Sequence, residues 1–176
     1  MFLYSLLALA VVTALIFAAP LKAKVWATLA VVAAGALWAS ATAVGVLAGG
    51  HTVRLWATDV FLFGSDAGSM DPLSALFALI VSVGAVAAVL YSRGYLAHYL
   101  GRKSPTHISL HYTALATMFY AMLGVVTSEG GFSFLFFWEL MTVASFLLIL
   151  FDAERRELFR TSGADAVIGK LGATYE

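Results

Sequence analysis

Glu139 is the residue whose type and position most clearly predict chemistry, because it is a carboxylate inside an apolar run over residues 134–141. At about 1.5 Å per residue it lies near the middle of an expected membrane-crossing helix. A carboxylate there costs about 3 kcal/mol, and each surrounding Leu, Ile, Phe or Val returns about 0.3–0.6 kcal/mol. We predict that Glu139 is a proton-relay site. The alternative is that protonated Glu139 hydrogen-bonds a neighbouring helix and only holds the two together.

A stripe of polar and small residues on the preceding expected helix could hold a water path to Glu139. Its members recur at helical spacing and share one side of that helix. They are Thr113, Thr117, Tyr120 and Gly124. Thr142, one turn after Glu139, adds a further hydroxyl. The alternative is that hydroxyls and glycine at this spacing let helices pack closely, and the spacing leaves both roles open.

Two other residues have a predicted local role. His111, at the start of the same expected helix, is a candidate for proton entry. Asp71 directly precedes Pro72, which predicts a helix N-cap whose carboxylate accepts backbone N–H bonds. The four histidines show no metal-ligand spacing, and the chain has no phosphate loop and no Ser-His-Asp pattern. The sequence therefore predicts no catalytic residue, no metal site and no cofactor bound by this chain.

The composition determines the class of protein. Of the 176 residues, 62% are hydrophobic and 11% charged, and the mean hydropathy is +0.94. A soluble domain has about 45–50% apolar and about 25% charged residues. The absence of cysteine excludes disulfides and iron–sulfur ligation by this chain. We predict an all-α integral membrane protein whose surroundings are the lipid bilayer, with no nucleic-acid partner.

Five apolar runs are long enough to cross the hydrocarbon core, which takes about 20 residues each. We expect transmembrane helices at about residues 2–19, 25–47, 72–91, 110–128 and 132–151. Residues 49–70 mix charges and glycines with aromatic and branched side chains, which predicts an interfacial hairpin or a short amphipathic element. Residues 152–176 form a tail, with a short amphipathic helix expected over 161–176.

Lysine and arginine accumulate on the cytoplasmic side of membrane proteins, so their positions predict the orientation. Nine of the ten basic residues lie in the first joint, the third joint or the tail: Lys22, Lys24, Arg93, Arg102, Lys103, Arg155, Arg156, Arg160 and Lys170. The other joints hold only Arg54. This bias predicts an odd number of spans, with the N-terminus outside and the tail in the cytoplasm. The alternative for the first run is a cleaved signal peptide, although no positive residue precedes it.

Three strings together carry a family resemblance: residues 70–77 (MDPLSALF), residues 91–96 (YSRGYL) and residues 136–142 (FFWELMT). They resemble the proton-translocating antiporter-like subunits of respiratory complex I, of the Mrp antiporters and of membrane-bound hydrogenases related to formate hydrogenlyase. The spelling around Glu139 looks most like the hydrogenase branch. The resemblance spans about residues 70–152, and the first two helices match only in hydropathy.

The resemblance implies that Glu139 is a proton-pathway residue that works with a lysine on a later helix. Such subunits have far more helices than the five expected here, so the chain looks like a family N-terminal portion, from a split subunit or a truncated product. Lys170 lies in the polar tail and is not expected to be the partner lysine.

The leading hypothesis is therefore a membrane subunit of a redox-driven proton or sodium pump in a prokaryotic inner membrane, hydrogenase-like or complex I-like. Redox cofactors would belong to partner subunits of that assembly. One alternative is a structural or assembly segment that conducts nothing, and another is a subunit of an Mrp-type cation/proton antiporter. A small independent transporter would need an oligomer to build a pathway around Glu139.

Overall fold

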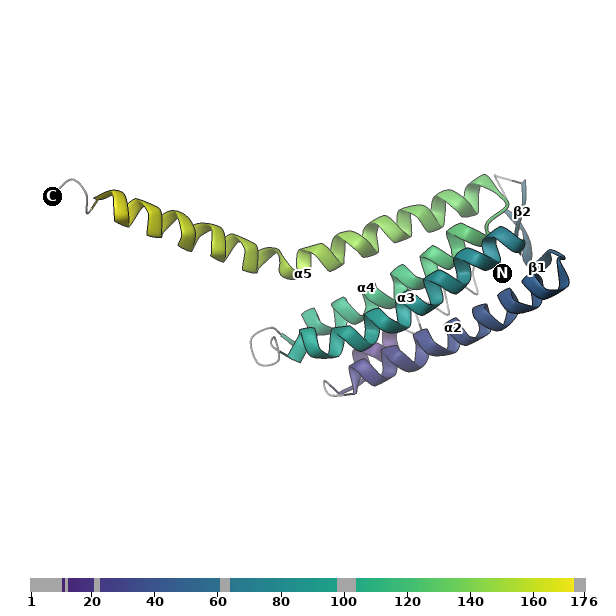
Figure 1. Ribbon diagram of the computed structural model, residues 1–176, viewed down its shortest axis with the longest axis horizontal. Helices are drawn as coiled ribbons and strands as arrows, with labels where there is room; N and C mark the ends of the chain where they lie inside the picture. The colour runs from purple at the N-terminus through teal and green to yellow at the C-terminus, as the bar shows by residue number, and fades with distance from the viewer. Residues whose placement is uncertain (1–10, 12, 21–22, 61–63, 98–103, 173–176) are drawn as a thin grey trace.

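The chain is mostly helical. A computed structural model describes residues 11, 13–20, 23–60, 64–97 and 104–172, and their side chains except at 58–60, 64 and 152–172. The long helices are α2 (Lys24–Gly49), α3 (Pro72–Ala97), α4 (Pro105–Thr127) and α5 (Gly131–Gly172) (Figure 1). Lys24–Gly49, Pro72–Ala97, Pro105–Thr127 and the part Gly131–Phe151 of α5 are long and apolar enough to cross a membrane. The chain is therefore a multi-pass membrane protein.

The first expected span, over residues 2–19, lies largely outside the described residues, but its end is visible. Residues 13–18 are helical, and Ile16 is fully buried in the main core. Lys24 Nζ donates to the carbonyl oxygens of Ile16 at 2.8 Å and Phe17 at 3.0 Å. Lysine often satisfies carbonyls at a helix end in this way, because these have no partner within their own helix. Lys24 thus joins the first segment to α2.

Helix boundaries differ from the sequence expectation where capping residues set them. α4 begins at Pro105, five residues before the expected start, and the Ser104 Oγ accepts a hydrogen bond from the His107 N–H at 3.4 Å. A serine cap followed by proline is a strong helix start. α5 continues through the expected tail to Gly172, in place of a separate helix over 161–176. Figure 1 shows that α5 bends near its middle and that its second half leaves the bundle.

Residues 49–70 contain a β-hairpin, which is one of the two forms predicted for this joint. The fold class is therefore not strictly all-α. β1 (Val53–Val60) and β2 (Gly64–Met70) pair antiparallel, with an irregularity between Arg54 and Trp56. The Trp56 indole lies over Gly68, where a Cβ atom would overlap the ring. The absence of a side chain at Gly68 therefore lets the tryptophan cover the hairpin.

The helices pack in chain order with α4 in the centre. α2 packs along α3, and α4 contacts α3, α2 and α5. The Tyr120 hydroxyl donates to the Val31 carbonyl of α2 at 2.8 Å, and its ring lies against Gly35. One turn further along α4, the Phe137 ring of α5 lies against Gly124. Glycines thus admit an aromatic ring at each of these two helix contacts.

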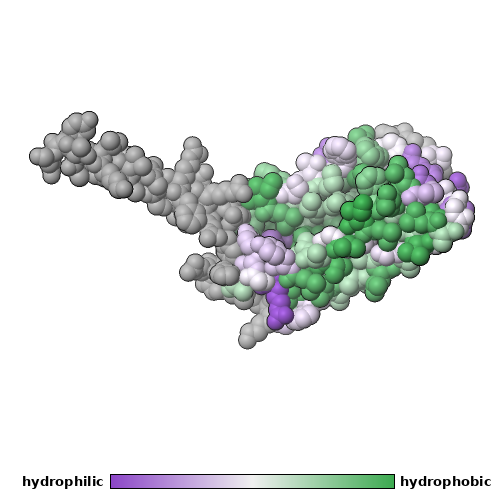
Figure 2. All heavy atoms as spheres, in the orientation of Figure 1, coloured by the Kyte–Doolittle hydropathy of each residue, from purple (hydrophilic) through white to green (hydrophobic). Residues whose placement is uncertain are grey.

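Apolar side chains also cover the outside of the bundle, as expected where lipid is the solvent. Leu37, Val83 and Leu135 are more than 60% exposed, and Figure 2 shows the hydrophobic surface running over the helices, with the hydrophilic residues gathered toward the ends. At the end opposite the hairpin, the Arg93 guanidinium lies 5.3 Å from the centre of the Trp26 ring. That distance suits a cation–π contact.

Gly124→Ala should lower the free energy of unfolding by about 1–3 kcal/mol, because the added methyl group overlaps the Phe137 ring and overpacks the contact between α4 and α5. Gly84→Ala in α3 is the matched control, since a Cβ atom there meets nothing within 4 Å. The control should be neutral or stabilising by up to about 1 kcal/mol. SDS titration of the purified chain in mixed micelles measures both. Equal effects of the two changes would contradict the packing role of Gly124.

Candidate functional site

Glu139 is exposed on the face of α5 that points away from α4. The orientation follows from Phe137, whose ring packs on Gly124 of α4. Each residue turns an α-helix by about 100°, so Glu139 points about 200° away from Phe137. Ser133, Ala144 and Phe151, on the side of α4, are buried instead. The contact between α4 and α5 therefore directs the Glu139 carboxylate outward from the bundle.

The surroundings of Glu139 on this face are apolar. Leu135 is 62% exposed, Trp138 48% and Val143 52%. The Thr142 hydroxyl, expected to lie on a water path, donates to the Trp138 carbonyl at 3.1 Å within the same helix. Within the described part of the chain no cation and no hydrogen-bond donor accompanies the Glu139 carboxylate. A group that supports its charge must therefore come from outside these residues.

The structure does not bring the polar stripe on α4 to Glu139. Tyr120 reaches α2 through its bond to Val31, and Gly124 is covered by Phe137. The Thr113 Oγ1 is buried and has no hydrogen-bond partner among the described residues, and Thr117 is half-buried. Tyr120 and Gly124 thus take the packing role that their spacing also allowed.

His111 lies among aromatic rings where three helices meet. Its ring centre is 4.7 Å from that of Phe151 on α5, 6.1 Å from Tyr95 on α3 and 5.9 Å from Tyr112. Its Nδ1 is buried with no hydrogen-bond partner in the described structure. Phe151 follows Glu139 by twelve residues, about 18 Å along the helix. The structure therefore places His111 far from Glu139, toward the end opposite the hairpin.

Asp71 begins α3. Its Oδ1 accepts the Ser74 N–H at 2.6 Å, and its carbonyl accepts the Ala75 N–H at 2.8 Å. The bond from the Ser74 backbone holds the pKa of Asp71 below its ordinary value of 3.8, because it favours the charged carboxylate. Asp71 has a structural position at the hairpin end, outside the spanning segments.

Asp66 of β2 is a functional candidate that the sequence did not single out. It is 5% exposed, and its Oδ2 accepts the Ser133 N–H at 2.9 Å. Its Oδ1 accepts the Ser133 hydroxyl at 3.0 Å and the Ala67 N–H at 2.9 Å. Ser133 belongs to the first turn of α5, so Asp66 caps that helix from a distant part of the chain. The available sequence signal was that Gly130 and Gly131 start this helix without a side-chain cap of their own.

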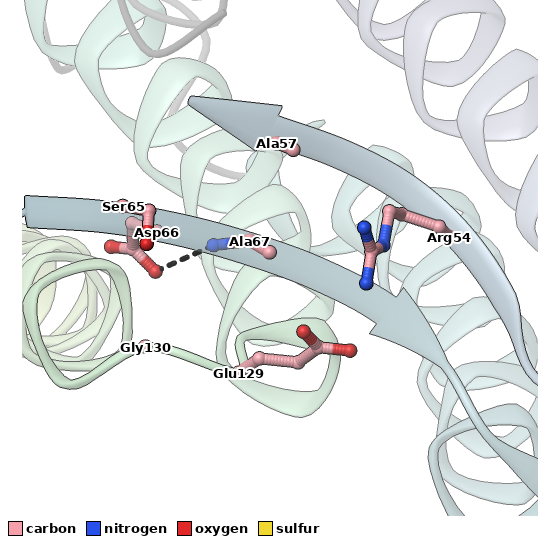
Figure 3. A pocket seen from close by; sticks show the side chains of 7 residues that line it. All are labelled: Arg54, Ala57, Ser65, Asp66, Ala67, Glu129 and Gly130. Carbon is pink, nitrogen blue, oxygen red and sulfur yellow. Dashed lines mark hydrogen bonds between the residues drawn. The ribbon is translucent and has the colours of Figure 1, made fainter. Parts of the chain in front are cut away.

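The Asp66 carboxylate forms part of the wall of a hollow of about 510 Å³ between the hairpin and the joint of α4 and α5. The lining residues are Arg54, Ala57, Ser65, Asp66, Ala67, Glu129 and Gly130. Figure 3 shows Arg54 and Glu129 extending into the same space from opposite walls. The backbone closes the joint nearby, because the Glu129 N–H donates to the Ala67 carbonyl at 2.9 Å and Gly68 bridges to Ser128.

Comparison with known proteins identifies the class of membrane subunit that this chain resembles. No protein-family model matches the chain. It is similar to an antiporter subunit of Staphylococcus saprophyticus, with 35% identity over 82 residues. It is also similar to the Na⁺/H⁺ antiporter subunit A1 of Staphylococcus aureus strain JH9, with 39% identity over 87 residues. These matches cover 47% and 49% of this chain, but only 10% of each relative.

The similarity supports an antiporter-like membrane subunit, as the three motifs predicted. Both relatives carry antiporter names. The preference for the hydrogenase branch, drawn from the spelling around Glu139, finds no support in them. The same holds for a complex I-like assembly and for a link to an oxidoreductase.

Replacing Asp71 with alanine should destabilise the chain by about 1 kcal/mol near pH 7, because the start of α3 loses its cap. A depressed native pKa means that this stabilisation is complete above the unfolded pKa, near 3.8, and disappears as the pH falls through the still lower native pKa. We expect the difference in free energy of unfolding between wild type and Asp71→Ala to decrease on acidification. Unfolding in mixed micelles at pH 7 and at acid pH measures this difference. Asp71→Asn keeps a hydrogen-bond acceptor without a charge, so its stability should lack this pH dependence. A stability difference between wild type and Asp71→Ala that stays constant with pH would contradict the charged cap.

Proposed function

We propose that this chain is part of a membrane subunit of an Mrp-type cation/proton antiporter, in which Glu139 takes up and releases protons inside the membrane. The observation that supports this most directly is the position of Glu139, a carboxylate in a spanning helix on a face that the described helices leave open. Similarity to two antiporter subunits over about half of the chain supports the same class.

The open face of α5 indicates which groups must lie beside Glu139 for it to release and take up protons. A charged carboxylate facing pure hydrocarbon is costly, because the membrane interior does not solvate it. Reversible proton release requires a polar or charged group next to the carboxylate, and no described side chain places a cation or a hydrogen-bond donor there. We infer that further helices, from the same subunit or from a partner, cover this face and bring that group. Both relatives are named as subunits, which supports partner chains in the membrane.

The proposed topology has five spans, with the N-terminus outside and the C-terminal half of α5 in the cytoplasm. Lys24 and Arg93 lie at one end of the bundle, and Arg54 lies at the other end with the hairpin. The positive-inside tendency assigns the first end to the cytoplasm of a prokaryotic cell and the hairpin to the outer side. The helical residues before Ala19, joined to α2 by Lys24, support a first span that stays with the bundle.

The proposal replaces the redox-driven hypothesis with an ion-driven one. In an antiporter, the cation gradient and the proton gradient drive each other, and no electron donor is needed. Glu139 alternates between a protonated and a charged state, and its neighbours determine which side of the membrane the proton reaches. His111, Thr113, Thr117 and Thr142 stay proposed members of the path, with any water between them and Glu139 running through groups beyond the described residues.

Glu139→Gln tests the proposal, because glutamine keeps the size of the side chain but cannot carry a proton through repeated cycles. In inverted membrane vesicles containing the complete assembly, Na⁺-dependent proton exchange should fall at least about a hundredfold, while the amount of assembled protein is unchanged. Glu139→Asp should retain partial exchange. Glu157→Gln is the matched control on the same helix beyond the spanning part, and it should leave exchange as in the wild type.

Three other outcomes separate the alternatives. Full exchange in assembled Glu139→Gln would assign the chain a structural role without ion conduction. Unchanged Na⁺ exchange together with lost redox-coupled proton pumping would favour the oxidoreductase reading. Loss of assembly in Glu139→Gln, but not in the control, would make the carboxylate a packing group between helices.

A further inference from the structure

We propose that Asp66 is a positioning residue for Glu139, acting through the first turn of α5. The inference rests on the proposed relay function of Glu139 and adds a distant residue on which that function depends. Asp66 belongs to β2 at the hairpin end, and Ser133, which it holds, follows it by 67 residues in the chain.

The start of α5 lacks a cap from its own sequence. Gly130 directly precedes α5 and Gly131 is its first residue, and neither has a side chain that could accept a backbone N–H. The Ser133 N–H is instead accepted by the Asp66 Oδ2 at 2.9 Å, and the Ser133 hydroxyl is bonded to the other carboxylate oxygen. A carboxylate at a helix N-terminus also interacts favourably with the helix dipole. Both oxygens of Asp66 therefore hold the same turn of α5.

The site fits this carboxylate closely. A Cβ atom on Gly130 would overlap the Asp66 carboxylate, so glycine is required for the approach. Asp66 itself is fixed, because its Oδ1 accepts the Ala67 N–H. The neighbouring backbone is also tied to the joint, through the bond from the Glu129 N–H to the Ala67 carbonyl. The Asp66 carboxylate thus fixes the start of α5 relative to the hairpin.

Two contacts then determine how α5 is rotated. Asp66 holds Ser133 at its start, and Gly124 holds Phe137 one turn later. Glu139 follows Ser133 by six residues, about 9 Å along a rigid helix. α5 packs mainly against α4 and touches the hairpin strand β2 only at its start, so loss of the Asp66 contact leaves the packing against α4, with Phe137 in it, to hold this part of α5. A small rotation about the helix axis would move the Glu139 carboxylate away from the groups it must exchange protons with.

Asp66→Ala should change the position of α5 and lower the proton exchange rate, by up to about a hundredfold if the Glu139 carboxylate moves by about 1 Å. The position of α5 can be measured by electron paramagnetic resonance in the complete assembly. Spin labels at Leu47→Cys on α2 and Leu135→Cys on α5, both exposed and in a chain without cysteine, report the distance between these helices at the hairpin end. The distance distribution should shift or broaden in Asp66→Ala.

Three further variants sharpen the test. Gly130→Ala should act like Asp66→Ala, because its methyl group displaces the carboxylate from the opposite side. Asp66→Asn should be intermediate, since its amide oxygen still accepts one bond from Ser133. Ser65→Ala, an exposed neighbour on the same strand, is the control and should change neither distance nor rate. If Asp66→Ala does not accumulate in membranes, Asp66→Asn and Gly130→Ala provide the same comparison.

The outcomes distinguish this inference from the proposed function. Unchanged distances in Gly130→Ala and the Asp66 variants would overturn the inference, whatever happens to transport. The inference would also be overturned if the Asp66 variants shift the distance but keep a normal exchange rate, in an assembly that Glu139→Gln inactivates. In that case α5 would move without affecting the relay. A shifted distance in an assembly where Glu139→Gln is fully active would overturn the proposed function and leave Asp66 as the cap of α5 alone.

Discussion

The hydrocarbon core offers no hydrogen-bond partners, and this constraint determines how the backbone of the spanning segments is paired. An unpaired backbone N–H or carbonyl there costs several kcal/mol, so each crossing segment is a helix that pairs its own backbone. The unpaired groups at the helix ends must find partners outside the core. Asp71 supplies one at the start of α3, Asp66 at the start of α5, and Lys24 at the end of the first segment. The hairpin, whose outer edges cannot all be paired, lies at the end of the bundle.

Glu139 is an ionisable side chain that lies within a spanning segment and faces outward from the described helices. The same constraint makes it informative. An ionisable group within a membrane is costly unless polar or charged groups accompany it, which is why the proposed function places further helices against this face of α5. The two antiporter relatives of the chain are matched over only 10% of their own length.

Close packing of small residues is the second determinant of the site. In lipid, apolar helices gain little from burying apolar surface against one another, so van der Waals fit largely decides how they pair. Gly124 accepts Phe137 and Gly35 accepts Tyr120, which holds α4 between α2 and α5. The glycine at position 124 therefore helps to determine which face of α5 is covered, and with it the direction in which Glu139 points.

What the sequence determined by itself was local. Hydropathy indicated the membrane class and the four described spans. An apolar run of about 20 residues is long enough to cross the hydrocarbon core as a helix. The order Asp71, Pro72 indicated a helix start, and counting residues along one helix predicted a position for Glu139 near the middle of its span. Each of these inferences concerns residues within one continuous segment, where helix geometry relates the positions to one another.

Only the tertiary structure decided which faces meet. The spacing of Thr113, Thr117, Tyr120 and Gly124 placed them on one side of a helix but could not say which helix lay there, and the structure turns Tyr120 to α2 and covers Gly124 with α5. The bond between Asp66 and Ser133 spans 67 residues. Nothing in either local sequence specifies it, because contacts between distant residues depend on how the helices pack and not on the pattern within each one.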